Sequence, residues 1–329
     1  MQIIIVKPII KDGQIQLDTR QITFSDYSFL RNELFAVRLS SAVKKEESVC
    51  LLIGEAADKK IEVLQSAGAI VESIRKMEDN FVHVTFWDHS ALLKLEMTIE
   101  HAQAYLDLLT QSLHSGEQVL MSVKNGLIYN VRPYDGVANN WFRDSRQYSF
   151  EPSTLKPVIT EAELAQIFTY LANEACTLNP LNIDYCITFQ YVWDGCFARA
   201  HKMREVMQSQ FNVTCQKIFN YGSLAVAAYN HCVTWGWHVA PVVTVVSTTG
   251  INEQYVIDPS VAAMPLTITQ WRNIQLNSCS GHATLYSYDI VDGKCYGRKN
   301  SSGNYTSFDD NYHYTNIWLS DHRDTPTFE

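Results

Sequence analysis

The sequence predicts an α+β protein built from two domains. Its 329 residues are about twice the length of a typical domain. Strand patterns with turn signals and amphipathic helical patterns occur in both halves, and a stretch rich in Asn, Asp, Ser and aromatic residues with no clear period separates them. We therefore expect an N-terminal domain over residues 1–135, a linker over 136–157 and a C-terminal domain over 158–329.

The composition is that of an ordinary globular protein. Hydrophobic residues make up 46% and aromatic residues 12% of the chain. The 26 basic residues are outnumbered by 35 acidic ones, and no basic block is longer than a pair, which disfavours nucleic acid as a partner. The longest apolar stretches, such as VAPVVTVV at 239–246, are far shorter than the about 18 residues of a membrane helix. We expect neither a nucleic-acid nor a membrane partner.

The cysteines are unevenly distributed along the chain. Cys50 lies alone in the first half, and all others follow residue 170. If Cys196 is a free nucleophile, six other cysteines remain in the second half, which is enough for up to three disulfides. Disulfides would indicate that the protein is delivered to an oxidising compartment. Cys176 and Cys186 could form a local bridge or both be reduced core residues. No C-x2-C or H-x3-H pair occurs, so we expect no metal site.

The start of the N-terminal domain predicts a mixture of elements. The turn residues KDG at 11–13, between IIIVKPII and QIQL, indicate a hairpin. KKIEVLQSAGAIVESIRKM at 59–77 has apolar residues near helical spacing and an interrupting Gly68, which predicts a helix or a broken pair of helices. FVHVTFW at 81–87 alternates and predicts a strand.

The rest of this domain carries a helix and a second hairpin. TIEHAQAYLDLLTQSLHSGE at 98–117 predicts a helix with Thr98 as its N-cap and Gly116 at its end. Its apolar face is expected to consist of Ile99, Ala102, Leu106, Leu109 and Leu113. QVLMSVKNGLIYNVRP at 118–133 predicts two strands joined by a type I′ turn at Asn125-Gly126.

The C-terminal domain opens with two predicted helices. ITEAELAQIFTYLANEA at 159–175 begins with a capping box formed by Thr160 and Glu163. Further on, Cys196 directly follows an Asp-Gly turn pair and begins a stretch with helical spacing, CFARAHKMREVMQSQF. The helix dipole and the unpaired N–H groups there favour a thiolate and can bind an oxyanion. His201 is expected to face away from this thiol and to be structural.

A base and a carboxylate are predicted on a downstream hairpin. TWGWHVAPVVTVV at 234–246 predicts a strand with His238 near its start, and YVIDPS at 255–260 predicts a second strand with Asp258 near its end. His238 and Asp258 are equidistant from residue 248 in the turn, so they should lie within about two residues of direct opposition. A helix bearing a thiol, packed on an antiparallel sheet bearing His and Asp, is the arrangement of a Cys-His-Asp triad.

Motifs in this half resemble those of the bacterial protein-glutaminases, secreted enzymes that deamidate glutamine side chains in intact proteins. They are WDGCFARAHKM, CVTWGWHVA, IDPS and WRN, in the family's order and with similar spacing, between about residue 160 and about residue 290. The resemblance implies a papain- or transglutaminase-like fold with Cys196 as nucleophile, His238 as base and Asp258 as the orienting carboxylate. The implied reaction passes through a thioester and needs no metal or organic cofactor.

Part of the N-terminal domain resembles the family's pro-region, which covers the active cleft until proteolysis removes it. The resemblance lies in the strand, helix, strand order of residues 82–126, and the first 75 or so residues have no counterpart. By position it implies a blocking segment near Trp87, Ser90 and Ala91. The family and the cysteines suggest export, whereas the N-terminus has no secretory signal pattern. Cytoplasmic location or delivery as an effector therefore stays open.

The surroundings of the triad suggest a substrate pocket. Gln190 stands six residues before Cys196, the spacing that papain-type proteases use for an oxyanion-hole glutamine, although backbone N–H groups could suffice. Tryptophans near the triad could shape a slot for the aliphatic part of a glutamine or belong to the core. The residues expected around the pocket are Gln190, Trp193, Gly195 and Trp237.

The expected partners are proteins or peptides with an exposed glutamine, and the N-terminal domain as an intramolecular inhibitor. A cysteine peptidase or a transglutaminase-like acyltransferase would share the triad and differ in acyl donor or acceptor. A host-directed deamidase effector or toxin would instead use its N-terminal half to bind a partner.

Overall fold

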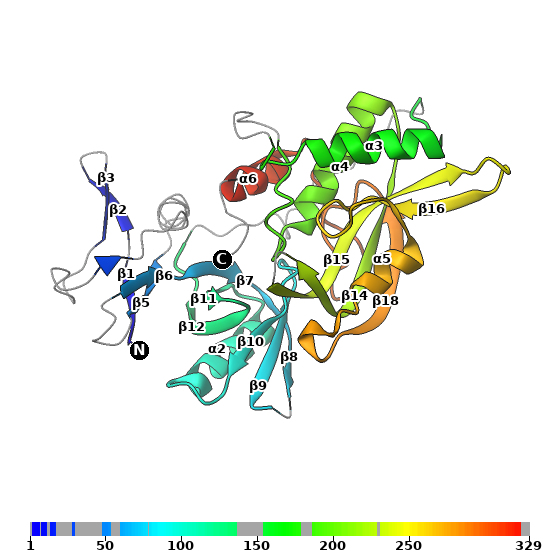
Figure 1. Cartoon of the computed structure of the whole chain (residues 1–329). Helices are drawn as coiled ribbons and strands as arrows, with labels where there is room; N and C mark the ends of the chain where they lie inside the picture. The colour runs from blue at the N-terminus through cyan, green and yellow to red at the C-terminus, as the bar shows by residue number, and fades with distance from the viewer. Residues whose placement is uncertain are drawn as a thin grey trace. The chain divides into compact units, whose positions relative to one another are not determined.

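The computed structural model divides into two compact units, Met1–Asn139 and Asn140–Glu329 (Figure 1). The residues that the structure describes are 2–6, 8–11, 14–17, 28–29, 48–53, 60–77, 79–136, 154–178, 186–228 and 231–323. Most of the predicted linker, at 136–157, lies outside these residues. The two units are described separately below.

The first unit contains a six-stranded sheet with a helix packed on it (Figure 1). In spatial order its strands are β7 (Gln65–Ala69), β11 (Val119–Lys124), β12 (Leu127–Pro133), β10 (Leu93–Glu96), β9 (Phe81–Phe86) and β8 (Val71–Lys76). Leu106 and Leu109 of α2 (Ala102–Ser115) share one apolar core with Val84 and Met121 of the sheet. The strand predicted from FVHVTFW is confirmed as β9.

Smaller sheets precede this one in the chain. One has the spatial order β1 (Gln2–Val6), β5 (Val49–Ile53), β6 (Lys60–Val63) and β4 (Ser28–Phe29). The other is an antiparallel pair of β2 (Pro8–Lys11) and β3 (Gln14–Leu17). Lys11 pairs with Gln14 across the turn, which confirms the hairpin predicted there.

The helix predicted over 59–77 is wrong, because this segment forms β6, β7 and β8. Its β-branched residues lose side-chain freedom in a helix and pack well on a pleated surface. The strands that pair with β7 and β8 are β11 and β9, which follow later in the chain. Gly68 is required by packing rather than by a helix break, since a Cβ there would come within 2.4 Å of the Tyr134 ring.

The predicted ends of the α2 region are partly confirmed. Thr98 does not cap the helix: its hydroxyl donates to Glu96, and the N-cap is His101, whose φ is 65°. Gly116 ends the helix as predicted, with φ 69° and its N–H bonded to the Ser112 carbonyl. Asn125 and Gly126 have φ values of 52° and 74°, as the predicted type I′ turn requires.

The second unit is built on a long antiparallel sheet (Figure 1). In spatial order its strands are β17 (Leu266–Thr267), β16 (Asn252–Val256), β15 (His231–Val246), β14 (Gln216–Ala228) and β18 (Thr284–Asp292), and β13 (Val158–Thr160) runs parallel to β15. The hairpin predicted at 234–260 is confirmed by the pairing of β15 with β16.

Helices cover both faces of this sheet. They are α3 (Glu161–Asn173), α4 (Cys196–Phe211), α5 (Ile268–Ile274), the 3-10 turn η2 (Ser278–Ser280) and α6 (His313–His322). Val239 and Val243 of β15 pack with residues of α4, whereas Ala240 and Val242 pack with Trp271 of α5. The capping box predicted at Thr160 is confirmed. Among the described residues, no helix is long and apolar enough to cross a membrane.

Candidate active site

Cys196 is the first residue of α4, as the sequence predicts. Its side chain is buried and its thiol forms no disulfide. The preceding Gly195 is the N-cap and has φ 77°, a conformation that glycine adopts at little cost. A Cβ on Gly195 would lie 1.8 Å from the Trp318 ring of α6, so no other residue fits beneath this indole. The turn before Cys196 is therefore fixed by both conformation and packing.

His238 lies near the middle of β15, on the face that α5 covers. Its imidazole is stacked between two indoles, with ring centroids 4.4 Å from Trp235 and 5.4 Å from Trp271. His238 Nε2 lies 2.8 Å from Asp258 Oδ2. Val242 pairs with Val256, so the register places Asp258 two residues from direct opposition to His238, as predicted.

Asp258 receives hydrogen bonds at both carboxylate oxygens. Trp271 Nε1 donates to Oδ2 at 2.9 Å, and the Ser260 hydroxyl donates to Oδ1. Burial alone raises the pKa of Asp258, but the interactions with His238, Ser260 and Trp271 outweigh burial and lower it. Asp258 therefore remains a carboxylate in a site from which water is excluded.

His238 is held in one orientation with one nitrogen left available. Burial by itself lowers the pKa of His238, but the Asp258 carboxylate and the Cys196 side chain raise it to about 9. Nδ1 is buried and has no hydrogen-bond partner of ordinary geometry in the part of the chain that the structure describes. Because Cys196 is one of the groups that raise this pKa, its side chain lies near the His238 imidazole.

His201, the other buried histidine of α4, has different surroundings. Its Nε2 lies 3.0 Å from the Asp309 carbonyl and its Nδ1 lies 2.8 Å from Lys217 Nζ. Burial, followed by the charges of Lys217 and Arg204, holds the pKa of His201 well below its usual value. These contacts agree with the structural role expected for His201.

The residues expected around a pocket have mixed surroundings. Gln190 Nε2, the donor that an oxyanion would need, is 2.9 Å from the Arg323 carbonyl. Trp237 is fully buried between the rings of Phe197 and Phe219. Trp193 is half-buried against a separate apolar cluster. The pocket roles of Gln190, Trp193, Gly195 and Trp237 stay predictions.

The predicted blocking residues lie in the first unit, between β9 and β10. Trp87 donates its N–H to the Ile70 carbonyl, and Ala91 belongs to the apolar core of that unit. Ser90 is fully buried. Their role as a blocker also stays a prediction.

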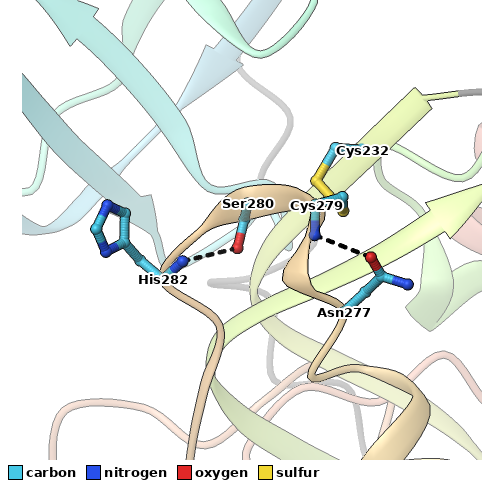
Figure 2. The surroundings of a disulfide bond; sticks show 5 residues. All are labelled: Cys232, Asn277, Cys279, Ser280 and His282. Carbon is cyan, nitrogen blue, oxygen red and sulfur yellow. Dashed lines mark hydrogen bonds between the residues drawn. A yellow bond between two sulfur atoms is a disulfide. The ribbon is translucent and has the colours of Figure 1, made fainter.

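Four of the cysteines form disulfides, Cys176 with Cys186 and Cys232 with Cys279. Cys215 and Cys295 are buried and are not joined to another cysteine, so the third bridge that their number would allow is absent from the described residues. Figure 2 shows the Cys232 bridge, which joins the start of β15 to η2, where Asn277 Oδ1 accepts the Cys279 N–H at 2.9 Å. Within the described ranges, no group of three or more His, Cys, Asp or Glu side chains is placed to hold a metal ion.

Sequence reasoning missed several residues that surround Cys196 and Asp258. Trp271 and Ser260 both bond Asp258, and Arg199 lies fully buried one turn after Cys196. Each belongs to a motif that was noted in the sequence, WRN, IDPS or WDGCFARAHKM. The motifs indicated their place in the chain but not which atoms they contact.

Comparisons with known proteins relate this chain to the glutaminases. A family model described as glutaminase matches residues 164–275. The crystal structure of pro-protein-glutaminase is similar to this chain, with a TM-score of 0.64 and 28% identity over 80% of this chain and 94% of that one. No curated protein matches the chain.

Two further solved structures match about half of this chain. The crystal structure of protein-glutaminase has a TM-score of 0.49 and 37% identity, over 52% of this chain and 92% of that one. The NMR structure of protein-glutaminase from Chryseobacterium proteolyticum has a TM-score of 0.48 and 36% identity, over 52% of this chain and 92% of that one.

Proposed function

Because the chain belongs to the protein-glutaminase family, we propose that it converts glutamine side chains of proteins and peptides to glutamate and releases ammonia. The observation that carries this proposal is the His238 imidazole. One of its nitrogens is bound to Asp258 at 2.8 Å, and Cys196, a free thiol at the N-terminus of α4, lies near enough to the ring to help raise its pKa.

We assign the chemical roles from this geometry. His238 Nε2–H donates a hydrogen bond to Asp258, which leaves Nδ1 to accept a proton from Cys196. The sulfur attacks the side-chain amide carbon, and the carbonyl oxygen becomes an oxyanion near the first N–H groups of α4. His238 then returns the proton to the leaving nitrogen, and ammonia departs as the thioester forms.

Hydrolysis of the thioester completes the cycle. His238 removes a proton from water, the hydroxide adds to the thioester carbon, and the carbon–sulfur bond breaks. Cys196 recovers its proton, and the product is a glutamate side chain. No step in this sequence calls for a metal or an organic cofactor.

We also propose that the first unit keeps the full chain latent. The similarity to pro-protein-glutaminase covers 80% of this chain, which is more than the second unit alone. The segment containing Trp87, Ser90 and Ala91 is the proposed blocker. Proteolysis between residues 136 and 157 should then raise ammonia release by the full chain, and an intact chain that is already fully active would contradict latency.

We propose that the protein functions outside the reducing cytoplasm. The two disulfides of the second unit support an oxidising destination. The protein in fractions of the producing cells would be measured together with its disulfide state. If all of it were found in the cytoplasm and none of the disulfide-bonded form outside, this location would be contradicted.

The proposed reaction is tested with a glutamine-containing protein as substrate. Intact-mass spectrometry should show amide-to-acid conversion, with ammonia released in equal amount and no peptide cleavage. Cys196→Ala should reduce the rate by about 10⁶-fold or to background, because the nucleophile is lost. Peptide fragments would instead indicate a peptidase. Covalent attachment of an added amine to the substrate, in place of conversion to the acid, would indicate a transglutaminase.

A further inference from the structure

We propose that Arg199 is a positioning residue for this reaction: its buried guanidinium holds the turn before Cys196 and stabilises negative charge on the sulfur and on the oxyanion. The proposal rests on the proposed function, because it takes Cys196 as the nucleophile. Arg199 itself is not placed in contact with the substrate.

Arg199 binds the turn before Cys196 through several donors. Its Nη1 donates to the carbonyl oxygens of Tyr191 and Asp194, the latter at 2.7 Å. Its backbone N–H donates to the Gly195 carbonyl at 3.0 Å. Trp235 Nε1 holds one more carbonyl of the same turn, that of Val192, at 2.9 Å.

These bonds determine which polar groups of the turn remain available. A carbonyl oxygen directed at the sulfur would repel both the thiolate and the oxyanion. Four carbonyls of residues 191–195 are instead engaged by Arg199 and Trp235. The N–H groups at the start of α4 have no acceptor within the helix and are left to interact with negative charge.

The charge of Arg199 acts on the same site. The side chain is 2% exposed, and its Nη2 has no hydrogen-bond partner among the described residues. Burial lowers the pKa of Arg199, and the charges of Cys196, Asp258 and Asp194 oppose this effect. The guanidinium therefore lies close enough to Cys196 and Asp258 for its positive charge to attract negative charge that develops there. Low solvent exposure makes the attraction stronger than it would be at the surface.

A purely structural arginine would give a different result on substitution. It would lower stability without changing how the reactivity of Cys196 depends on pH. Arg204 offers a matched control, since it is also buried in α4 and its Nη1 donates to the Tyr312 hydroxyl at 2.8 Å. The Tyr312 hydroxyl lies at the N-cap of α6, whereas Arg199 binds the turn before Cys196.

The test compares Arg199→Met, Arg199→Lys and Arg204→Met in the form of the protein that releases ammonia. For each we would measure thermal unfolding, kcat and KM on a protein substrate, and the rate of iodoacetamide alkylation of Cys196 between pH 4 and pH 9. Arg199→Met should move the midpoint of the alkylation profile upward by about one pH unit and lower kcat by about 10²-fold, with KM changed less. Arg199→Lys should keep the midpoint but lose kcat, because it retains the charge and lacks the planar fork. Arg204→Met should leave both unchanged.

An unchanged alkylation midpoint in folded Arg199→Met would overturn the proposal. If Arg199→Met does not fold, a wild-type kcat in Arg199→Lys would overturn it in the same way. The two proposals fail separately. Retained activity in Cys196→Ala would contradict the proposed function, whereas lost activity in Cys196→Ala with normal Arg199 variants would remove only the role of Arg199.

Discussion

His238 and His201 are two buried histidines in the same unit with opposite electrostatic surroundings. Each side chain is at most 1% exposed. His238 is bonded to the Asp258 carboxylate and its pKa rises to about 9, whereas His201 is bonded to Lys217 and its pKa falls well below the usual value. Burial alone would lower the pKa of both histidines.

The comparison shows that a neighbouring carboxylate can raise the pKa of a buried histidine although burial by itself lowers it. In the proposed mechanism, His238 holds a proton because Asp258 lies at Nε2, and it exchanges that proton with Cys196 through Nδ1. His201 has both nitrogens engaged, by the Asp309 carbonyl and by Lys217. Four experiments test this contrast between the two histidines.

The largest effect is expected from Asp258→Asn, which removes the charge that distinguishes His238. The amide can no longer stabilise an imidazolium or enforce the proton on Nε2. We expect kcat to fall by about 10⁴-fold while the protein remains folded. Ammonia release and circular dichroism would be measured together, and a loss below tenfold in a folded variant would mean that Asp258 does not orient the base.

The next largest effect is expected in the pH dependence of kcat/KM. Because the pKa of His238 is raised to about 9, its positive charge is present at neutral pH and is lost as pH rises through that value. We expect kcat/KM to fall about tenfold for each pH unit above this point. By the same sign, the stability that the charged pair contributes is fully present below the unfolded-state pKa of about 6.5 and is lost as pH rises through about 9. A decline that is already complete at neutral pH would contradict the pairing.

Ser260→Ala should have a smaller effect, because the carboxylate stays and loses one donor. The Ser260 hydroxyl binds Asp258 Oδ1, the oxygen that does not contact His238. Loss of this bond should cost about 1.5–3 kcal/mol, or roughly ten- to a hundredfold in kcat if it is expressed fully in the transition state. Trp271→Phe is the companion variant, since it removes the donor to Oδ2 and keeps an aromatic ring against His238.

Lys217→Met should leave activity within about twofold, because it changes the surroundings of His201 and of the Cys295 carbonyl and not the pairing of His238 with Asp258. Burial first, and then the charge of Arg204, lowers the pKa of Lys217 to about 7. Between that value and the unfolded-state pKa of about 10.5, the unfolded chain binds more protons, so wild-type stability should rise with pH relative to the variant. Denaturant unfolding at pH 7 and pH 10 would measure the difference, and a large loss of kcat would mean that the two histidines are coupled.

Local rules in the sequence predicted much of the second unit. The capping box at Thr160 and the approach of His238 to Asp258 are confirmed because each depends on neighbouring residues or on one short turn. The segment 59–77 was misread as helix because the strands that stabilise it, β9 and β11, lie later in the chain. The same limit explains why the side-chain contacts of Arg199 could not be read from its motif.

The bridge between Cys232 and Cys279, drawn in Figure 2, closes a long loop of the chain. His238, Asp258, Ser260 and Trp271 all lie within the 47-residue separation of those cysteines, so the proposed base and the carboxylate bound to it belong to one covalently closed loop. Closing a ring of this size removes about 4 kcal/mol of chain entropy from the denatured state. Reducing agents should therefore speed heat inactivation of the protein, even though no sulfur of the bridge takes part in the reaction.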